Sequence, residues 1–372
     1  MNPFRGIEID GLRSSHGYHT MNNSWNQNET QSNAPKRSNL QIGSQAGERE
    51  FTCFQETLGN YNPRAWRPRT LFSQFEGSFL ELMTNKQGIF LFQMLLNECE
   101  DEQLDSLVQE LLLRDTKSFV SAAYCEEGST SINKLIKRIK KTIHAYTLTG
   151  LLSITLDCLM SDNTAKTVIK QCLDQFGSRP NEVLYENVIL HYMKLATDEV
   201  GCRSLNECIS TISGKQKITL FEKIVDEAVF LSNDRYGNYV VQHAMILGHD
   251  IVTYKVMQRL CGHFTQLSQN KGGSHVVEKC LNSSSFGTDL VVGEILQTKL
   301  APFQLARHQY GNYVIQAALR NLKRQRKEIL YVSLVKALKP HFPQLQRYAG
   351  GKNVVNLIRT DIEIPYQCWP EY

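Results

Sequence analysis

The chain has 372 residues, of which 41% are hydrophobic, and its 41 basic and 37 acidic residues leave a formal net charge of only +4. This composition allows an extensive core, and so small a charge argues against a binder that relies on electrostatics alone while permitting a nucleic-acid partner. The N-terminus lacks an apolar signal region, and Asp157 interrupts the most hydrophobic stretch, residues 150–160, so we expect neither secretion nor membrane insertion.

The first 60 residues have the composition of a disordered segment. Residues 21–33 are rich in Asn, Gln and Ser and almost devoid of aliphatic side chains. Such a segment cannot bury enough apolar surface to offset the entropy lost on ordering. We therefore predict a disordered polar tail over residues 1–60 and a folded domain over residues 61–372.

A repeated motif organises this folded domain. Gly-Asn-Tyr-Val-Val-Gln at residues 237–242 returns as Gly-Asn-Tyr-Val-Ile-Gln at 311–316, with Gly-Ser-His-Val-Val-Glu at 273–278 between them. The residues that follow the glycines of the strong copies are 36, 36 and 38 residues apart: Cys202, Asn238, Ser274 and Asn312. Weaker copies begin near residues 88, 128, 165 and 351. Self-similarity at a fixed period is typical of a repeat solenoid.

Each repeat is predicted to be helical. Residues 218–231 carry apolar side chains at helical spacing, and after a break near the glycine a second helix begins around Asn238. Alternating runs long enough to predict strands are missing from the sequence. We therefore expect stacked helix pairs. The predicted repeats lie around residues 70–107, 108–144, 145–181, 182–215, 216–251, 252–287 and 288–327, with a C-terminal cap over 328–372.

The ten cysteines form neither a Cys-x-x-Cys pair nor a His/Cys ligand pattern, so the sequence predicts no metal site and no cofactor. Cys158, Cys172, Cys208 and Cys280 fall on apolar faces of predicted helices. We expect the buried, reduced thiols of an intracellular protein rather than disulfides.

The copy at residues 237–242 has the side chains of a base reader. Asn238 and Gln242 lie one helical turn apart on the same face, the valines between them point into the core, and Tyr239 lies to one side. Two amides can complement the acceptor–donor–acceptor edge of uracil. The adjacent ring offers stacking worth about 1–3 kcal/mol per base. One base per repeat suits this arrangement.

The copy at residues 273–278 predicts a different base. An ionised Glu278 can only accept hydrogen bonds, and guanine alone places two adjacent donors, N1–H and N2–H, on its pairing edge. His275 takes the place of the tyrosine as a stacking platform, and Arg203 can stack through its guanidinium plane in the preceding repeat. We therefore expect guanine between two uracils.

The three motifs, in this order and spacing, resemble the last three repeats of a Pumilio (PUF) RNA-binding domain. The run Gly201-Cys202-Arg203 resembles the fifth repeat of the family, and residues 351–353 resemble its C-terminal capping element. The resemblance covers about residues 70 to 372. It implies an all-α fold, a right-handed α-solenoid or superhelix of about eight PUF-type helical repeats, crescent-shaped.

In that family the chain runs antiparallel to the RNA, so the resemblance implies a 5′-UGU-3′ core. The implied RNA-binding residues, from the 5′ base onward, are Asn312, Tyr313 and Gln316 for U, Ser274, His275 and Glu278 for G, Asn238, Tyr239 and Gln242 for U, and Cys202, Arg203 and Asn206 for a weakly favoured adenine. The weak preference reflects Asn206, which stands where the family usually has glutamine.

The resemblance also implies a biological role. Family members are not enzymes; they mostly bind single-stranded RNA in the 3′ untranslated regions of mRNAs and repress translation or promote decay. The implied partners are therefore mRNA and translation-repression or deadenylation factors. We expect a monomer in the cytoplasm, with a nuclear or nucleolar fraction as a further location.

The N-terminal repeats depart from this pattern. The triads Ser129/Thr130/Asn133 and Lys166/Thr167/Lys170 match no familiar reading pair, and a repeat before residue 88 is absent or unrecognisable. Ile89 has no polar group, although Phe90 and Gln93 could stack and hydrogen-bond. We expect the 3′ half of the RNA site to be loosely specified.

Other interpretations remain open at this point. A single Asn-Tyr-Val-Val-Gln could be an ordinary exposed helix face, and Lys166 and Lys170 fit a solvated face as well as a phosphate contact. The basic run Arg320, Lys323, Arg324, Arg326 and Lys327 is a weak candidate for phosphate steering. An armadillo-like protein-interaction scaffold, or a divergent PUF-like protein that binds RNA without sequence preference, would also have helical repeats. Catalytic motifs are missing from the sequence.

Overall fold

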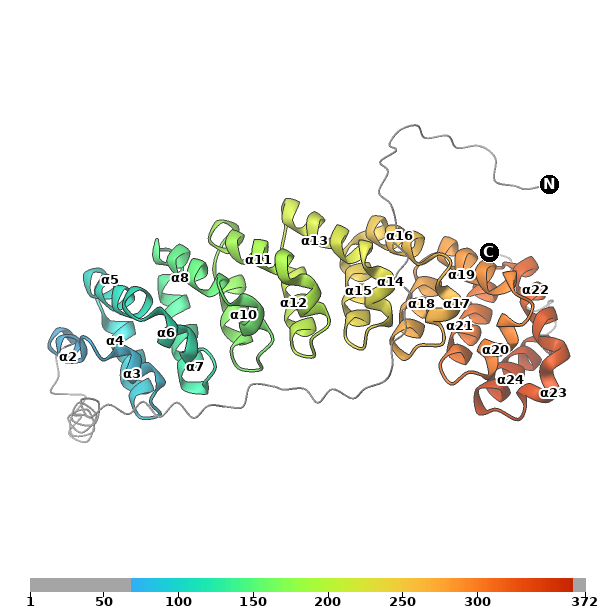
Figure 1. Ribbon diagram of the computed structural model, residues 1–372, viewed down its shortest axis with the longest axis horizontal. Coiled ribbons are helices and arrows are strands. Elements are labelled where there is room, and N and C mark those ends of the chain that lie inside the picture. The colour runs from blue at the N-terminus through green and yellow to red at the C-terminus, as the bar shows by residue number, and fades with distance from the viewer. Residues whose placement is uncertain (1–67, 364–372) are drawn as a thin grey trace, which may run out of the picture. The chain divides into compact units, whose positions relative to one another are not determined.

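The structure, a computed structural model, describes residues 68–363, and these form helices and short turns (Figure 1). The prediction of an all-α solenoid is confirmed, because helical repeats follow one another along the whole described range. The predicted tail at residues 1–60 lies outside the described residues. Among the described residues, no helix is long and apolar enough to span a membrane.

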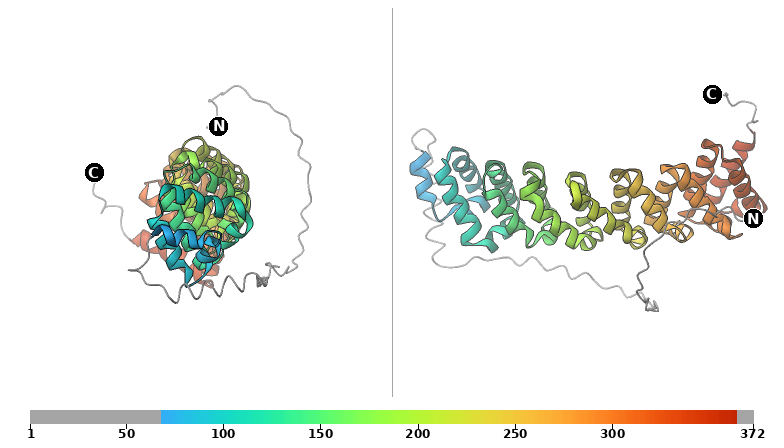
Figure 2. Two further views of the ribbon diagram at one scale, coloured as in Figure 1. Left: turned by 90° about the vertical axis from the view of Figure 1, so that its left-hand side faces the viewer. Right: turned by 90° about the horizontal axis from the view of Figure 1, so that it is seen from above.

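One helix of each repeat carries the sequence motif, and we call these the motif helices. They are α4 (Gly88–Glu98), α7 (Glu126–Ile139), α10 (Lys166–Gln175), α12 (Gly201–Thr211), α15 (Gly237–Leu247), α18 (Lys271–Ser283), α21 (Gly311–Arg324) and α24 (Ala349–Glu363). Each packs against the motif helix before it and the one after it, so the eight form one continuous layer (Figures 1 and 2).

The remaining helices form a second layer and the connections. The second layer consists of α5 (Asp101–Gln109) with the π-helical turn η1 (Glu110–Arg114), α8 (His144–Ser153), α11 (Ser178–Ala196), α13 (Gly214–Asp226), α16 (His249–Leu260), α19 (Ser285–Gln297) and α22 (Glu328–Leu338). Short helices precede the motif helices: α2 (Pro68–Phe75), α3 (Phe79–Thr84), α6 (Thr116–Ala122), α9 (Leu156–Met160), α14 (Ala228–Asn233), α17 (Phe264–Leu267), α20 (Ala301–Arg307), and the pair η2 (Lys339–His341) and α23 (Phe342–Leu345).

The core lies between the two layers and is filled by apolar side chains that recur at helical spacing. In α15 the residues Val240 and Val241 are fully buried, and in α13 Leu220 and Ile224 pack inward while Ile218 on the opposite face is 60% exposed. The prediction that the motif valines point into the core is therefore confirmed. Burial of one face per helix supplies most of the stability of such an array.

A recurring cap sets where the motif helices begin. Asp234 Oδ1 accepts hydrogen bonds from the backbone N–H groups of Tyr236 (2.8 Å) and Gly237 (2.7 Å), and Asn270 Oδ1 accepts from Gly272 and Gly273 in the same way. These donors would otherwise lack a partner at the start of a helix. Asn85, Asp162, Asp198 and His308 occupy the equivalent place before other motif helices.

The motif glycine is required by close packing against the preceding short helix. A Cβ atom on Gly237 would lie 2.8 Å from the carbonyl oxygen of Leu231, and one on Gly311 would lie 2.9 Å from Leu305 Cδ2 and 3.0 Å from the Leu305 carbonyl oxygen. Side chains do not tolerate such distances. This explains why glycine recurs at the repeat period.

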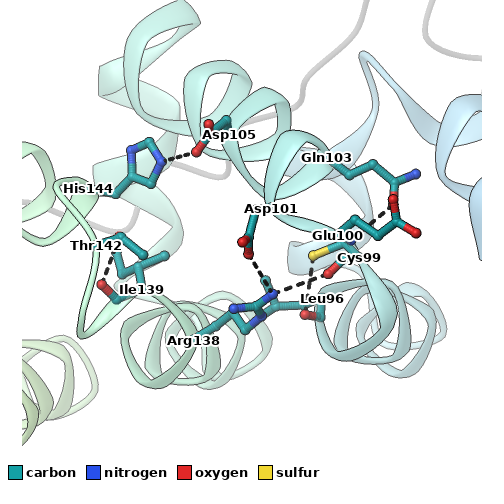
Figure 3. A network of polar contacts seen from close by, with 10 residues as sticks. All are labelled: Leu96, Cys99, Glu100, Asp101, Gln103, Asp105, Arg138, Ile139, Thr142 and His144. Atoms are coloured by element: carbon teal, nitrogen blue, oxygen red, sulfur yellow. Dashed lines mark hydrogen bonds and ion pairs between the residues drawn. The ribbon is translucent and has the colours of Figure 1, made fainter.

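In the N-terminal repeats, polar contacts between neighbouring repeats join the helices (Figure 3). Arg138 in α7 donates a hydrogen bond to the carbonyl oxygen of Cys99 (3.2 Å) and lies 3.7 Å from the carboxylate of Asp101. His144 and Asp105 approach to 2.6 Å, which joins α8 to α5. These side chains hold the stack together and do not face a motif triad.

The cysteines in the described part of the chain are free thiols. Burial raises the pKa of the thiols of Cys172, Cys208 and Cys280, to about 12 for the last two. The prediction of buried, reduced thiols holds for these three, but it is wrong for Cys158, which is exposed. Cys158 lies in the short helix α9. This single helical turn leaves part of its surface exposed, and Cys158 lies on that part.

Candidate nucleic-acid interface

The motif helices bring the predicted side chains together in a repeating arrangement. In each motif helix we call the residue after the glycine the first edge position, the next residue the platform position, and the residue one turn after the first edge position the second edge position. Between α12, α15 and α18 these positions border a groove with a volume of about 810 Å³. Its lining includes Cys202, Arg203, Asn206, Asn238, Tyr239 and His275.

The platform positions stand out from the surface. Tyr239 and Tyr313 are each 56% exposed, although they are large aromatic residues. The side chains of His275 and Arg203 are similarly exposed, at 58% and 64%. Flat groups repeat in this way on four successive motif helices. Exposed planar side chains at a regular spacing provide surfaces on which bases stack.

The first edge position is far less accessible than the sequence suggested. Asn238 is only 2% exposed, and its Nδ2 donates to the carbonyl oxygens of Asp234 (2.9 Å) and Arg235 (3.0 Å) at the start of its own helix. Its Oδ1 accepts a hydrogen bond from Gln242 Nε2 at 3.2 Å. The two amides do lie together as expected, but they are bonded to each other, and Gln242 is the more accessible.

The same arrangement recurs in α21. Asn312 is 4% exposed and donates through Nδ2 to the carbonyl oxygens of His308 (2.8 Å) and Gln309 (3.0 Å). Gln316 Nε2 donates to Asn312 Oδ1 at 3.0 Å, and Gln316 Oε1 accepts from Arg320 Nη2 at 3.2 Å. Two copies of one sequence motif therefore adopt one hydrogen-bonding pattern, with an additional arginine in the second.

Glycines of the following repeat make room for the two buried asparagines. A Cβ atom on Gly272 would lie 2.6 Å from Asn238 Nδ2, and one on Gly350 would lie 2.5 Å from Asn312 Cγ. Each glycine directly precedes the motif glycine of its own repeat. The first edge position is consequently the floor of the interface, closed on one side by the next motif helix.

The copy in α18 combines a buried hydroxyl with a half-buried carboxylate. Ser274 is 2% exposed and its Oγ donates to the carbonyl oxygen of Lys271 at 3.1 Å. Burial raises the pKa of Glu278, while the charges of His275 and Arg320 act in the opposite direction. His275 Nδ1 lies 3.8 Å from Glu278 Oε1. An acceptor-only group thus sits beside an exposed ring, as the sequence predicted.

The fourth copy, in α12, has less to offer a base. Cys202 is 4% exposed, its Sγ donates to the carbonyl oxygen of Glu199 at 3.4 Å, and burial raises the pKa of this thiol. Asn206 is half-buried, and its Oδ1 has no hydrogen-bond partner among the described residues. A buried amide oxygen without a donor is available to accept a hydrogen bond from a ligand.

In the N-terminal repeats, edge positions of one repeat bond to the platform position of the next. Ser129 and Thr167 share a hydrogen bond of 2.8 Å between their hydroxyl groups, and Asn133 Nδ2 donates to the same Thr167 hydroxyl at 3.3 Å. Lys170 lies 3.5 Å from the carboxylate of Glu207 in α12. These groups present no ring, and Asn133 Oδ1 has no hydrogen-bond partner among the described residues. Only Phe90, 69% exposed, resembles a platform here.

The basic run at residues 320–327 is largely engaged by the protein. Arg320 donates to Gln316, Arg324 Nη2 donates to Asn321 Oδ1, and Lys327 Nζ pairs with Asp289 at 2.5 Å. From the sequence this run is only a weak candidate for phosphate steering. Helical spacing places Arg320 one turn after Gln316, and that spacing is the signal that could have identified the contact.

Comparisons with known proteins agree on one family. The sequence profile of the Pumilio-family RNA binding repeat matches residues 78–112, 191–225, 228–260, 263–295 and 303–334. It leaves unmatched residues 113–190, which contain the divergent triads.

Two relatives from Arabidopsis thaliana are similar to this chain over most of its length. Pumilio homolog 12 is 30% identical over 297 residues, which is 78% of this chain and 48% of the relative. Putative pumilio homolog 19 is 29% identical over 306 residues, 82% of this chain and 92% of the relative. The chain therefore spans about half the length of the first relative and most of the second.

Solved structures show the same architecture. The Puf4 RNA binding domain bound to the HO endonuclease RNA 3′ UTR recognition sequence superposes with a TM-score of 0.67 at 26% identity, covering 78% of this chain and 95% of that one. The RNA-binding domain of yeast Puf5p bound to AAT2 RNA superposes with a TM-score of 0.70 at 20% identity, covering 86% and 95%. The second likeness concerns the fold alone.

Proposed function

Because the chain belongs to the Pumilio family of RNA-binding repeat proteins, we propose that it reads a 5′-UGU-3′ core in single-stranded RNA through α21, α18 and α15. One base lies against each of these helices. The chain runs antiparallel to the RNA, so α21 takes the 5′ uracil and α15 the 3′ uracil.

The observation that carries this proposal is the row of exposed platform residues beside polar edge positions. Tyr313, His275 and Tyr239 lie on successive motif helices and are more than half exposed, while the valine or isoleucine residues that follow them are buried. An armadillo-like protein scaffold has no reason to repeat a flat exposed group next to a polar pair. Stacking of each base on such a group contributes about 1–3 kcal/mol.

The chemistry of the second edge position supports the base assigned to each helix. The amides of Gln316 and Gln242 each offer a donor beside an acceptor, which complements the N3–H and carbonyl groups of uracil. Glu278 offers only acceptors when ionised, which complements N1–H and N2–H of guanine and repels the acceptor groups of uracil. The order amide, carboxylate, amide along the layer therefore supports U, G and U.

We further propose that the RNA lies in mRNA 3′ untranslated regions and that binding represses translation or promotes decay. The solved Puf4 domain is bound to a 3′ UTR recognition sequence, and this chain has a similar fold. In this role the protein binds RNA without catalysing a reaction and acts in the cytoplasm through recruited repression or deadenylation factors.

Binding to short RNAs tests the proposal. Two oligomers of equal length, one with UGU and one with ACA at the same place, are compared by fluorescence anisotropy at fixed salt concentration, because phosphate contacts alone would bind both. We expect the UGU oligomer to bind at least tenfold more tightly. Equal affinities would sink the proposal and favour an RNA binder without sequence preference.

A further inference from the structure

The two uracil-reading helices differ in what holds the glutamine. In α21, Arg320 lies one turn after Gln316 and its Nη2 donates to Gln316 Oε1 at 3.2 Å. In α15 the residue one turn after Gln242 is Ile246, an aliphatic side chain that has no hydrogen to donate. The chain therefore contains the same reader with and without an arginine.

In α21 the direction of each side-chain hydrogen bond follows from the one before it, beginning with Asn312 at the start of the helix. Both hydrogens of Asn312 Nδ2 are used by backbone carbonyl groups, so only Asn312 Oδ1 faces Gln316. This oxygen must receive its hydrogen bond from Gln316 Nε2, at 3.0 Å. Gln316 Oε1 then faces Arg320, which can donate but never accept. Partners at both ends of one amide prevent it from turning over.

The orientation of this amide decides between two pyrimidines. Uracil presents N3–H and a carbonyl oxygen at O4, whereas cytosine presents an unprotonated N3 and an amino group at the same places. The donor and acceptor of an amide complement one of these patterns, and the flipped amide complements the other. A glutamine held in one orientation therefore rejects one pyrimidine more strongly than a glutamine that can turn.

We propose that Arg320 is a positioning residue that locks the amide of Gln316 and thereby sharpens the choice of uracil over cytosine at the 5′ base. This inference rests on the proposed function, since it names the origin of selectivity at one of the three bases. Burial agrees with it: Gln316 is 7% exposed, while Gln242, which lacks the arginine, is half-buried.

Reciprocal substitutions test the inference with a matched control inside the same protein. Arg320→Ile copies the α15 arrangement into α21, and Ile246→Arg does the reverse. Both are compared with wild type on three RNAs that carry UGU, CGU or UGC. We expect Arg320→Ile to lower the preference for U over C at the first base by about three- to tenfold, the effect of one hydrogen bond, and to leave the third base unchanged. Ile246→Arg should raise selectivity at the third base only.

Two results would overturn the inference. An equal loss for all three RNAs, with a weaker salt dependence, would mean that Arg320 acts through its charge, on a phosphate or on Glu278, instead of holding the Gln316 amide. An unchanged U-to-C ratio at the first base would mean that the arginine does not position the reader. Gln316→Ala provides a further control, because in that background Arg320→Ile should no longer change the ratio.

A measurement without RNA separates this inference from the proposed function. The side-chain NH2 signals of Gln316 in an NMR spectrum of the free protein should exchange with solvent several-fold faster in Arg320→Ile than in wild type. Unchanged exchange would refute the anchoring of Gln316 even if UGU is preferred over ACA. Faster exchange in a protein that binds UGU and ACA equally would instead refute the proposed function and leave the anchoring intact.

Discussion

The repeats with motif helices α4, α7 and α10 and those with α12, α15, α18 and α21 share a backbone plan but differ in what faces the motif surface. Both halves begin their motif helices at capped turns and bury the two positions before the second edge position. In the C-terminal half, polar edge groups bond within one repeat, and exposed planar side chains, the rings of Tyr239, His275 and Tyr313 and the guanidinium of Arg203, stand beside them. In the N-terminal half, Ser129, Asn133 and Thr167 bond across repeats and no ring accompanies them.

This difference shows that folding and base reading depend on different positions. The two positions before each second edge position hold the helices together, so they carry buried apolar residues or a buried serine in every repeat, and the motif glycine is replaced only in α10, by Ala165. The platform positions lie at the surface, where substitution costs little stability, whereas the first edge positions of the C-terminal half are buried. The solenoid can therefore keep its repeat period when base-reading side chains are replaced. We therefore expect substitutions at the edge and platform positions to change RNA binding in the C-terminal half only.

The largest effect is expected from exchanging the reader of the central base. Ser274→Asn with Glu278→Gln gives α18 the edge residues of α15, and we expect the preference to move from guanine towards uracil by on the order of a hundredfold. Binding to UGU and UUU oligomers measures the shift. Retained preference for guanine would contradict the base assignment in this half.

The size of the residue that packs against position 274 should determine how far the preference moves from guanine to uracil. Gly272 and Gly350 make room for the buried asparagines of α15 and α21, and the equivalent position after α18 is Tyr310. We expect Tyr310→Gly, added to the double substitution, to increase uracil affinity further. An asparagine at position 274 that works equally well beside Tyr310 would argue against this packing rule.

The next largest effect is expected at the platform positions, where substitutions should weaken RNA binding in the C-terminal half but not in the N-terminal half. Tyr239→Ala removes a stacking surface and should weaken UGU binding by about tenfold or more. Phe90→Ala removes an equally exposed ring in α4, but the next platform positions are Thr130 and Thr167, which have no ring. We expect less than a twofold change for Phe90→Ala. Similar losses for both variants would show that the RNA contacts the N-terminal repeats as well.

The packing of the interface floor can be tested with two glycines. Gly272→Ala brings a methyl group within 2.6 Å of Asn238 Nδ2, and overpacking of this kind costs about 1–3 kcal/mol. Gly293→Ala is the matched control in α19, where a Cβ atom meets nothing within 4 Å. Thermal unfolding should show a lower midpoint temperature for Gly272→Ala than for wild type. The midpoint temperature of Gly293→Ala should not fall, because alanine has a higher helix propensity than glycine. UGU binding should weaken only in Gly272→Ala.

A smaller effect should follow from pH. Burial raises the pKa of Glu278, so this carboxylate gains a proton at a higher pH than an exposed glutamate does. Only the ionised form accepts from both guanine donors, so selectivity for guanine is present above that pKa and should fall a few-fold as the pH drops from 7 towards 5. Glu278→Gln should abolish this dependence. The same titration in a His275→Tyr background removes the other titratable group beside the carboxylate.

The smallest effect is expected at Lys170. Its Nζ lies 3.5 Å from Glu207 and 3.9 Å from Asp174, so its charge is already paired. Lys170→Met should leave both RNA affinity and the salt dependence of binding unchanged. A shallower salt dependence would identify a phosphate contact and extend the interface into the N-terminal half.

Much of the fold could be predicted from particular residues of the sequence. The glycines at 201, 237, 273, 311 and 351 set the period and lie in the first turn of their motif helices, and the aliphatic pair in the copies at 237, 273 and 311 predicted the buried face. Arg203, Tyr239, His275 and Tyr313 were predicted as platforms, and all four are exposed. These features depend on local spacing, which a sequence contains directly.

The hydrogen-bonding partners were decided by the tertiary structure. Helical periodicity placed Asn238 on the same face as Gln242, but its burial arises because Gly272, from the next repeat, closes over it. The bond between Ser129 and Thr167 depends on the separation of α7 and α10 and on the direction of each side chain, whereas the bond between Gln316 and Arg320 follows from their spacing of one turn within α21. Periodicity along one helix determines a face and leaves open what lies opposite it, because that neighbour comes from a different part of the chain.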